Sequence, residues 1–421
     1  MGDEKEKGSQ VKYAIAAFMS ILVFVITYKY ALNQVNSDGI NDLIEHVRYA
    51  EVIYLDYLGR LWKIWLDMPY LFWHICVKGC IKFFHMPVGA AASCTHGGFA
   101  GITCFVTFVL LDRMGERLTG KNLGVPAALM AGILGFVQPW YVPWFNIYQY
   151  EGQYSINPIH NPTHMAVKPF GLLCFMLAVD LILVYGGKEK MFFTRVKRDR
   201  WLYILFGTTL FFSAFTKPTF MYMLLPAGVV YLLIELGIAL KKKDGSIKRV
   251  WSFMWRMACA SIPALLYLLL EYTAFYIWSD ARGESSVAIY PFLTAWHIFS
   301  PDVPRSLRLS MAFPFWMLIT NLKYFFQTEE GRLSLIGYAV GTLEFAFFVE
   351  TGHRLGHSNF AWPMMSGMLL LWVISGSRLI ILTKTPASKR WNTVVVTVGW
   401  ILLSIHLFSG FYFINPYMYI I

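Results

Sequence analysis

The sequence predicts an all-α polytopic membrane protein with about eleven transmembrane helices and one further amphipathic helix at the membrane interface. Its composition indicates this fold class, because 57% of the 421 residues are hydrophobic, 14% are charged and the mean hydropathy is +0.50. A soluble domain does not tolerate so apolar a composition. Apolar stretches of about 20 residues also recur along the chain, each long enough to cross a hydrocarbon core about 30 Å thick. We therefore expect a single integral membrane domain, 1–421.

The net charge of +11 arises largely from three short basic segments between apolar stretches, at 188–200, 241–249 and 384–390. Short cytoplasmic loops retain Lys and Arg, so these segments predict the cytoplasmic side of the membrane and not a nucleic-acid partner. The N-terminus is then expected in the cytoplasm, and the first apolar stretch is expected to remain as a helix because no small-residue cleavage site follows it. The predicted location is the cytoplasmic (plasma) membrane.

The predicted transmembrane helices cross the membrane in alternating directions. They are expected at about 13–32, 90–111, 123–142, 168–186, 201–216, 219–240, 253–277, 309–326, 333–350, 361–382 and 392–413. The segment 69–85 is short for a span and carries Lys78 and Lys82 on one helical face, as amphipathic surface helices do. If it crossed the membrane, the basic segments would lie outside, against the positive-inside rule.

This topology places the long polar loops on the extracytoplasmic side, where we expect any active site. The first of these loops carries Asp38, Asp42 and His46. If the loop is helical, Asp42 and His46 lie one turn apart on the same face and form a candidate general base with a supporting partner. An inverting glycosyl transfer needs one carboxylate to take the acceptor's proton, while a phosphate leaves with little acid help. The alternative is a solvated loop with ordinary capping residues.

The order of these N-terminal segments resembles the opening of the GT-C superfamily of polytopic glycosyltransferases. The matching pieces are the acidic loop 42–48, the segment 68–74 that Pro69 introduces, and the small-residue-rich helix 89–111. The resemblance implies a GT-C-like N-terminal module at 13–115, with a catalytic first outer loop. Further transmembrane helices and outer substrate loops would follow at 116–421. The base of the family would fall on Asp42, with Asp38 second.

The resemblance also implies the reaction and its partners. The chain would move a sugar from a polyprenyl-phosphate or polyprenyl-diphosphate donor to a glycan, lipid or protein acceptor of the cell envelope, among membrane lipids. Cationic side chains at the outer interface would hold the donor phosphate, since Arg can pair two phosphate oxygens at once. The candidates are Arg305, Arg308, His353 and Arg354. For Arg305 and Arg308 the alternative is ordinary snorkelling to the membrane interface.

An outer loop at 154–164 is dense in amides, imidazoles and prolines. Its candidate substrate-binding residues are Asn157, His160, Asn161 and His164. Two Asn-Pro steps favour extended backbone and expose side-chain amides, which suits recognition of sugar hydroxyls. The two histidines have a His-x-x-x-His spacing, but Pro162 lies between them and no Glu follows the first, so a zinc motif is not predicted.

A second polar edge is expected on the same side, with Glu350 and Asn359 as further substrate-binding candidates. Pairing of Glu350 with Arg354 is the more ordinary interpretation of that carboxylate. No metal site is predicted and no cofactor is required, although a divalent cation (Mg or Mn) stays open.

Five ionisable residues fall within or beside the apolar stretches: Asp180, Lys217, Glu235, Glu271 and Glu344. Such groups are costly in hydrocarbon and suggest function by default. Lys217 is assigned to a turn between two helices at the outer face, and only Asp180 and Glu344 are expected to lie deep in the membrane. The pattern therefore does not favour a proton relay.

Two other functions stay open. A transporter or lipid-linked sugar flippase would have a similar helix count, but such proteins commonly consist of two related halves, and the sequence shows no internal repeat. A polysaccharide polymerase or ligase would use a similar donor, but it usually concentrates its polar residues in one large later loop. Here the polar residues are spread over several outer loops.

Overall fold

The structure is a computed structural model that describes residues 2–37, 42–53, 65–66, 68, 70–141, 154–242, 246–279, 283, 285–300, 302–385 and 390–418. Most of these residues are helical. The α-helices are α1 (Gly2–Val35), α2 (Asp42–Val52), α4 (Phe72–Phe84), α5 (Val88–Thr119), α6 (Val125–Leu134), α7 (Pro162–Tyr185), α8 (Asp199–Thr216), α9 (Thr219–Lys242), α10 (Ser246–Thr273), α11 (Thr294–Phe299), α12 (Val303–Thr320), α13 (Leu322–Gln327), α14 (Glu329–Phe347), α15 (Ala361–Lys384) and α16 (Arg390–Met418).

The remaining elements are short. A π-helical turn, η1 (Ala274–Trp278), continues α10, and a 3₁₀-helix, η3 (Gly352–His357), precedes α15. Two strands, β1 (Val287–Ile289) and β2 (Phe348–Glu350), pair antiparallel with Val287 opposite Glu350.

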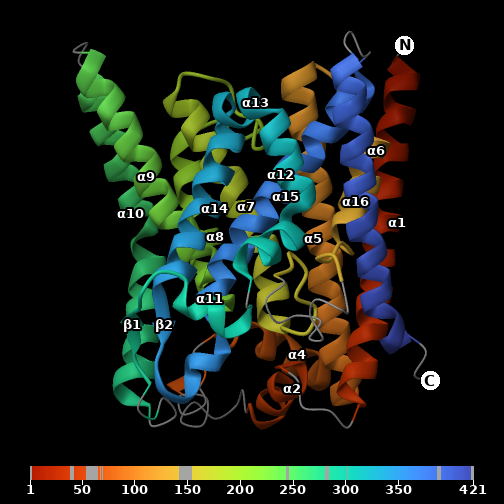
Figure 1. Ribbon diagram of the computed structural model, residues 1–421, viewed down its shortest axis with the longest axis vertical. Helices are drawn as coiled ribbons and strands as arrows, with labels where there is room; N and C mark the ends of the chain where they lie inside the picture. The colour runs from red at the N-terminus through yellow and green to blue at the C-terminus, as the bar shows by residue number, and fades with distance from the viewer. Residues whose placement is uncertain are drawn as a thin grey trace.

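Within the described residues, seven helical segments are long and apolar enough to cross a membrane: α1, α5, α7, α9, α10 with η1, α15 and α16. The chain is therefore an all-α membrane protein, as predicted. Figure 1 shows the long helices side by side along one axis, with α1 and α16 at one edge and α9 and α10 at the other.

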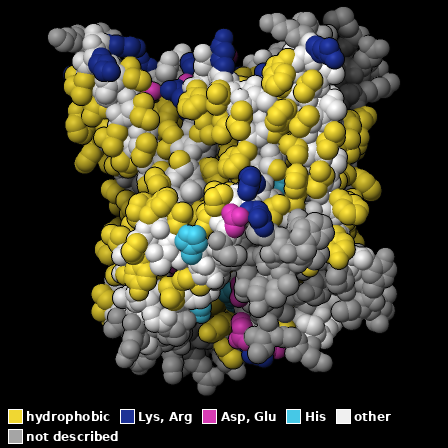
Figure 2. All heavy atoms as spheres, viewed as in Figure 1, with side chains coloured by type: hydrophobic (Ala, Val, Ile, Leu, Met, Phe, Trp, Pro, Cys, Tyr) yellow, Lys and Arg dark blue, Asp and Glu magenta, His cyan; other side chains and the backbone are white. Residues whose placement is uncertain are grey.

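Burial separates a helical core from a lipid-facing surface. In the most apolar windows of α7 and α15, 83% and 89% of the residues are buried, against 17% for α10. Leu266 and Leu269 of α10 are more than half exposed, as expected of side chains that contact lipid tails. Figure 2 shows apolar side chains over most of the described surface in that view, with most of the visible Lys and Arg side chains at the upper end and a few at mid-height and below.

Ion pairs connect helix ends at that upper end, which we call the basic end. Lys188, just after α7, pairs with Glu329 of α14 (Nζ to Oε1 2.9 Å), and Arg117 of α5 pairs with Glu330 (3.0 Å). The end of α9 and the start of α16 lie at the same end (Figure 1). The described residues of the three basic segments thus share one end of the bundle. At the opposite end lie α2, α4 and the two strands; we call it the α2/α4 end.

The helix expected at 69–85 is α4, which contains 13 residues. At 1.5 Å per residue it is about 20 Å long, too short to cross the hydrocarbon core. Trp73, His74 and Val77 are buried, whereas Phe83 and Phe84 are more than 70% exposed. This length agrees with the prediction of a helix that does not span.

The helix predicted at 123–142 is much shorter in the structure, where α6 ends at Leu134. After Leu134 the chain is no longer helical, and its backbone groups form hydrogen bonds with residues from other parts of the bundle. Gln138 N donates to His406 O (3.1 Å), and Asn157 Nδ2 donates to Leu134 O (2.7 Å) and to Val137 O (3.1 Å). Irregular backbone at membrane depth is tolerated only where protein groups satisfy it. The apolar composition of this stretch therefore reflects burial inside the bundle and not one continuous helix.

Other helix bounds also differ from those predicted. The helix expected at 168–186 begins at Pro162, because Asn161 caps its first turn. The helix expected at 309–326 starts earlier, at Val303, and divides at Asn321 into α12 and α13. Residues 162–164, assigned to an outer loop from sequence, are therefore helical.

Candidate functional site

The site is built around Asp42, the first residue of α2. Leu43, Val47 and Ala50 form one buried face of this helix and pack in a cluster with Trp73 of α4 and with small residues of α5. This apolar face holds α2 at the α2/α4 end of the bundle. Asp42 stays exposed at the helix N-terminus, where the helix dipole favours a negative charge.

Asn161 connects Asp42 to the bundle interior. Its Nδ2 donates to Oδ2 of Asp42 at 2.9 Å, and its Oδ1 accepts from Nζ of Lys217 at 3.0 Å. The same Oδ1 accepts from the backbone N of His164 at 3.0 Å, which caps α7. One buried amide thus joins a carboxylate and an ammonium group that lie 175 positions apart in the chain.

Lys217 lies at the junction between α8 and α9. Its backbone is extended (φ −172°, ψ 127°), as the following Pro218 favours. The side chain is only 6% exposed, and its Nζ lies 4.2 Å from the ring centroid of Trp362 and 5.9 Å from that of Tyr70. In the described part of the chain, no carboxylate lies within ion-pair distance of this ammonium group. Burial lowers the pKa of Lys217 to about 7, while the charge of Asp42 raises it.

A second polar cluster centres on Glu350, at the end of β2. Its Oε1 accepts from Tyr276 Oη at 2.5 Å and from Arg354 Nε at 3.1 Å, and its Oε2 accepts from Asn359 Nδ2. The expected pairing of Glu350 with Arg354 is therefore present. Arg354 also stacks over Phe275, 4.6 Å from the ring centroid. This Arg is thus already neutralised by a carboxylate, which weakens it as a phosphate ligand.

Tyr70 lies between the two clusters. Burial is the main reason that the pKa of its hydroxyl is raised; Arg354 opposes this, and Glu271, Glu350 and Asp42 add to it. Three carboxyl groups thus influence one phenol. Oε2 of Glu271 is buried and has no hydrogen-bond partner among the described residues. The α2/α4 end therefore gathers Asp42, Lys217, Glu271 and the Glu350 cluster around Tyr70.

His46 has a different partner from the one predicted. Its Nδ1 lies 3.0 Å from Nε2 of His74 in α4, and no hydrogen bond to Asp42 is seen in the described residues. Burial lowers the pKa of His74 to about 3, and burial and then His74 lower the pKa of His46. In a pair of neutral imidazoles, the N–H of one ring donates to the unprotonated nitrogen of the other. The pair therefore holds α2 on α4 and does not support the carboxylate.

Some residues of the loop 154–164 hold the fold together, and others lie near Asp42. The side chain of Asn157 is fully used by the fold, because it donates to two carbonyl groups and its Oδ1 accepts from Lys168 Nζ at 2.9 Å. Asn157 thus holds the backbone after α6, and its role in substrate binding stays a prediction. His164 is buried, with its ring 5.0 Å from that of Trp362.

His160 belongs to the Asp42 group. Its ring lies 6.3 Å from that of Trp362. The pKa of His160 is lowered, first by burial, while Asp42 raises it and Lys217 lowers it further. Both charges of the bridged pair therefore act on this imidazole. Of the four residues predicted in this loop, Asn161 and His160 are the ones that the structure brings to Asp42.

The predicted phosphate ligands Arg305 and Arg308 lie elsewhere. Both are exposed near the start of α12, where Arg305 pairs with Asp302 (3.3 Å) and Arg308 Nε donates to Pro304 O (3.3 Å). Helix α12 packs against α13, α15 and α16, whereas α2 packs against α1, α4, α5 and α7. The structure therefore does not bring the two arginines to Asp42. Asp38 and the side chain of His353 lie outside the described residues.

Lys217 is the functional candidate that sequence reasoning left out of the site. A lysine beside two apolar stretches is a recognisable signal, but its assignment to a turn between two helices at the outer face did not indicate that its side chain is buried. Over the described ranges, no group of three or more His, Cys, Asp or Glu side chains is placed to hold a metal ion. No model of a known protein family matches this chain, and no curated protein matches it. Function is therefore inferred from the geometry of the described residues.

Proposed function

We propose that this chain is a membrane glycosyltransferase of the GT-C type that transfers a sugar from a polyprenyl-phosphate or polyprenyl-diphosphate donor to a cell-envelope acceptor, with inversion. The observation that carries the proposal is the bridge from the Asp42 carboxylate through Asn161 to the Lys217 ammonium group. It combines an exposed base with a buried cation at one end of a membrane bundle.

Each member of the bridge has a role in this reaction. Asp42 takes the proton of the acceptor hydroxyl while that oxygen bonds to the anomeric carbon. The bond from that carbon to the phosphate oxygen breaks, and the phosphate leaves with the electron pair. Lys217 stabilises the phosphate charge, because an ammonium group removed from water interacts strongly with an anion. Two hydrogen bonds and one amide keep base and cation within about 8 Å of each other.

The second cluster offers an acceptor or sugar subsite. Near Tyr70, Glu271 presents a buried carboxylate oxygen that has no hydrogen-bond partner among the described residues, and a sugar hydroxyl would satisfy it. Glu350 and Asn359 already bond to each other and would bind a hydroxyl by exchanging that bond. Arg354 would orient Glu350 and contribute to the charge balance of the subsite.

The proposed topology has eleven spans, with the N-terminus and the basic end in the cytoplasm and the α2/α4 end outside. The four spans added to the seven apolar segments are α8, α12, α14 and a composite span, in which the irregular chain up to Tyr141 continues the short helix α6. Support comes from the common end of the three basic segments and from the positive-inside rule.

The decisive experiment is a donor assay. Purified protein is mixed with a panel of polyprenyl-phosphate and polyprenyl-diphosphate sugars, and the release of the free polyprenyl carrier is measured. Turnover of one donor class supports the proposal. Solute or lipid flux in liposomes without donor turnover would instead favour the transporter or flippase, and long products from a single acceptor would favour a polymerase.

The orientation can be tested by cysteine labelling in a variant without the six native cysteines. Gly356→Cys lies at the α2/α4 end, where an added Cβ meets no atom within 4 Å, and Glu189→Cys is exposed at the basic end. A membrane-impermeant maleimide is expected to label position 356 in intact cells and position 189 only after permeabilisation. The opposite pattern would contradict the topology and the extracytoplasmic site together.

The rate should depend on pH through Lys217. With its pKa near 7, this side chain loses its charge as the pH rises through neutrality. We expect kcat/KM for the donor to fall by up to about tenfold per pH unit above this value, because kcat/KM reports groups of the free enzyme. Lys217→Arg keeps its charge and should flatten the profile above pH 7. An unchanged profile in that variant would assign the titration to another group.

A further inference from the structure

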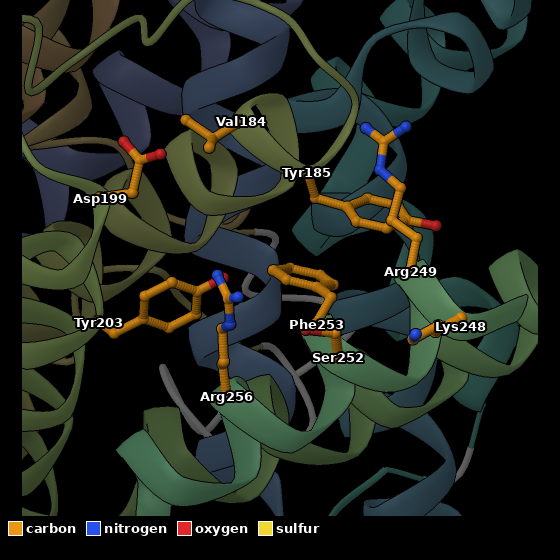
Figure 3. Close-up of a pocket in the computed structure, with 9 residues that line it drawn as sticks. All are labelled: Val184, Tyr185, Asp199, Tyr203, Lys248, Arg249, Ser252, Phe253 and Arg256. Carbon is orange, nitrogen blue, oxygen red and sulfur yellow. The ribbon is translucent and has the colours of Figure 1, made fainter. Parts of the chain in front are cut away.

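A cavity at the basic end, remote from the proposed transfer site, is built like a binding site for a phosphate group. It has a volume of about 490 Å³ and lies between the end of α7, the start of α8 and the first three turns of α10. Figure 3 shows Arg249 and Arg256 on opposite sides of it, with the rings of Tyr185 and Phe253 between them in this view and Tyr203 beside Arg256.

The positive charge of this cavity is largely uncompensated. Lys248, Arg249 and Arg256 line it, and within the described residues none of them forms an ion pair with a carboxylate. The one acidic lining residue, Asp199, is already paired with Lys190 (Nζ to Oδ1 2.8 Å). An anion would therefore enter a site with three cations and one neutralised carboxylate.

Aromatic rings hold the two arginines in place. Arg249 lies over the ring of Tyr185 at 5.0 Å, and Tyr185 stacks on Phe253 with ring centroids 4.7 Å apart and planes within 15°. The guanidinium group of Arg256 lies beside the hydroxyl of Tyr203 (Figure 3). Restricting a side chain before binding lowers the entropy that binding must overcome. These contacts thus restrict both guanidinium groups, and a guanidinium group can pair two phosphate oxygens.

The surroundings place this cavity at the depth of lipid headgroups. Trp201 of α8 and Trp251 and Trp255 of α10 are about half exposed or more, and tryptophan concentrates at the membrane–water interface. Farther along α10, away from the basic end, the side chains of Ile262 and Leu266 are also exposed. A molecule with a phosphate in the cavity and acyl chains along this helix would match both parts of the surface.

We propose that this cavity binds the headgroup phosphate of an anionic glycerophospholipid, with Arg249 and Arg256 as its principal ligands and Lys248 and Ser252 at the rim. The lipid chains run along the exposed apolar face of α10. These basic residues therefore have a role beyond membrane topology, because α7, α8 and α10 bring them together in a defined site. This inference is independent of the proposed transfer reaction.

The test is a titration of detergent-purified full-length protein with phosphatidylglycerol, phosphatidylcholine or inorganic phosphate, followed by thermal unfolding. Phosphatidylglycerol should raise the midpoint more than the neutral lipid does. Arg249→Gln/Arg256→Gln should weaken the apparent affinity for phosphatidylglycerol by about 25-fold, since each cation contributes a factor of about five. The control Arg195→Gln/Arg198→Gln removes equal charge from the same end outside the cavity and should bind as the unmodified protein does.

Three outcomes would overturn the proposal. Equal effects of the two lipids would show that the cavity does not select an anionic headgroup. An effect reproduced by inorganic phosphate alone would identify a soluble anion as the ligand. Equal losses in the two double variants would reduce the effect to general surface charge. Arg249→Lys/Arg256→Lys keeps both charges and should retain part of the affinity. Such retention would show that the loss in the Gln double variant does not come from misfolding.

Discussion

Asp42→Asn is expected to reduce donor turnover by about two to four orders of magnitude, the usual contribution of a general base. Asparagine has nearly the same shape as aspartate, and its side-chain oxygen can still accept the hydrogen bond from Asn161. What it lacks is the ability to take a proton from the acceptor hydroxyl. The release of free polyprenyl carrier measures the effect, with kcat lowered far more than the affinity for the donor.

Two matched variants make the result specific. Glu45→Gln removes an exposed carboxylate one turn further along α2, where, among the described residues, it pairs with the exposed Arg48 at 2.7 Å. It should leave turnover within about twofold, since exposed ion pairs contribute little. Glu271→Gln tests the other uncommitted carboxylate near Tyr70. If Asp42→Asn keeps full activity while Glu271→Gln loses it, the base has been assigned to the wrong residue.

Lys217→Met is expected to lower donor turnover by about a hundredfold to a thousandfold, the usual loss when one stabilising contact to a developing negative charge is removed. The fold should tolerate this change. Asn161 Oδ1 keeps the backbone N of His164 and the hydroxyl of Thr163 (3.1 Å) as donors, and a buried ammonium group is costly to desolvate. The thermal midpoint should therefore stay the same or rise, because methionine fills a similar volume without a charge.

A simultaneous measurement of activity and thermal unfolding separates the two possible roles of this lysine. Loss of activity with an unchanged midpoint indicates that the cation acts on the substrate. A midpoint that falls in proportion to the activity would mean that Lys217 only holds the helix junction together. Lys82→Met, an exposed lysine of α4 at the same end of the bundle, is the control for a simple change of charge.

Several features could be predicted from sequence because they depend on neighbouring residues. The apolar stretches identified an all-α membrane protein, and the two lysines on one face of 69–85 indicated a helix that does not span. The acidic residue after the first helix made Asp42 a candidate. The two Asn-Pro steps predicted exposed amides at 154–164, whereas the side chains of Asn157 and Asn161 are buried. Composition and spacing along the chain carry all of these signals.

Other features needed the packed structure. Asn157 and Asn161 both precede a proline in the same loop, yet one holds the backbone after α6 and the other connects Asp42 to Lys217. His46 lies one turn from Asp42 but bonds to His74 on another helix. Local spacing cannot distinguish these cases, because the partner of each side chain comes from a segment remote in sequence.

The sequence by itself determined the membrane class, the approximate positions of most helices and the candidate carboxylate, because hydrophobicity and helix periodicity act over about 20 residues. Only the tertiary structure decided that α6 ends at Leu134, that Arg305 and Arg308 lie away from Asp42, and that Lys217 is the buried cation of the site. The physical reason is that burial and hydrogen-bond pairing depend on which helices pack together. Three segments more than 50 residues apart must meet before a carboxylate, an amide and an ammonium group can form one bridge.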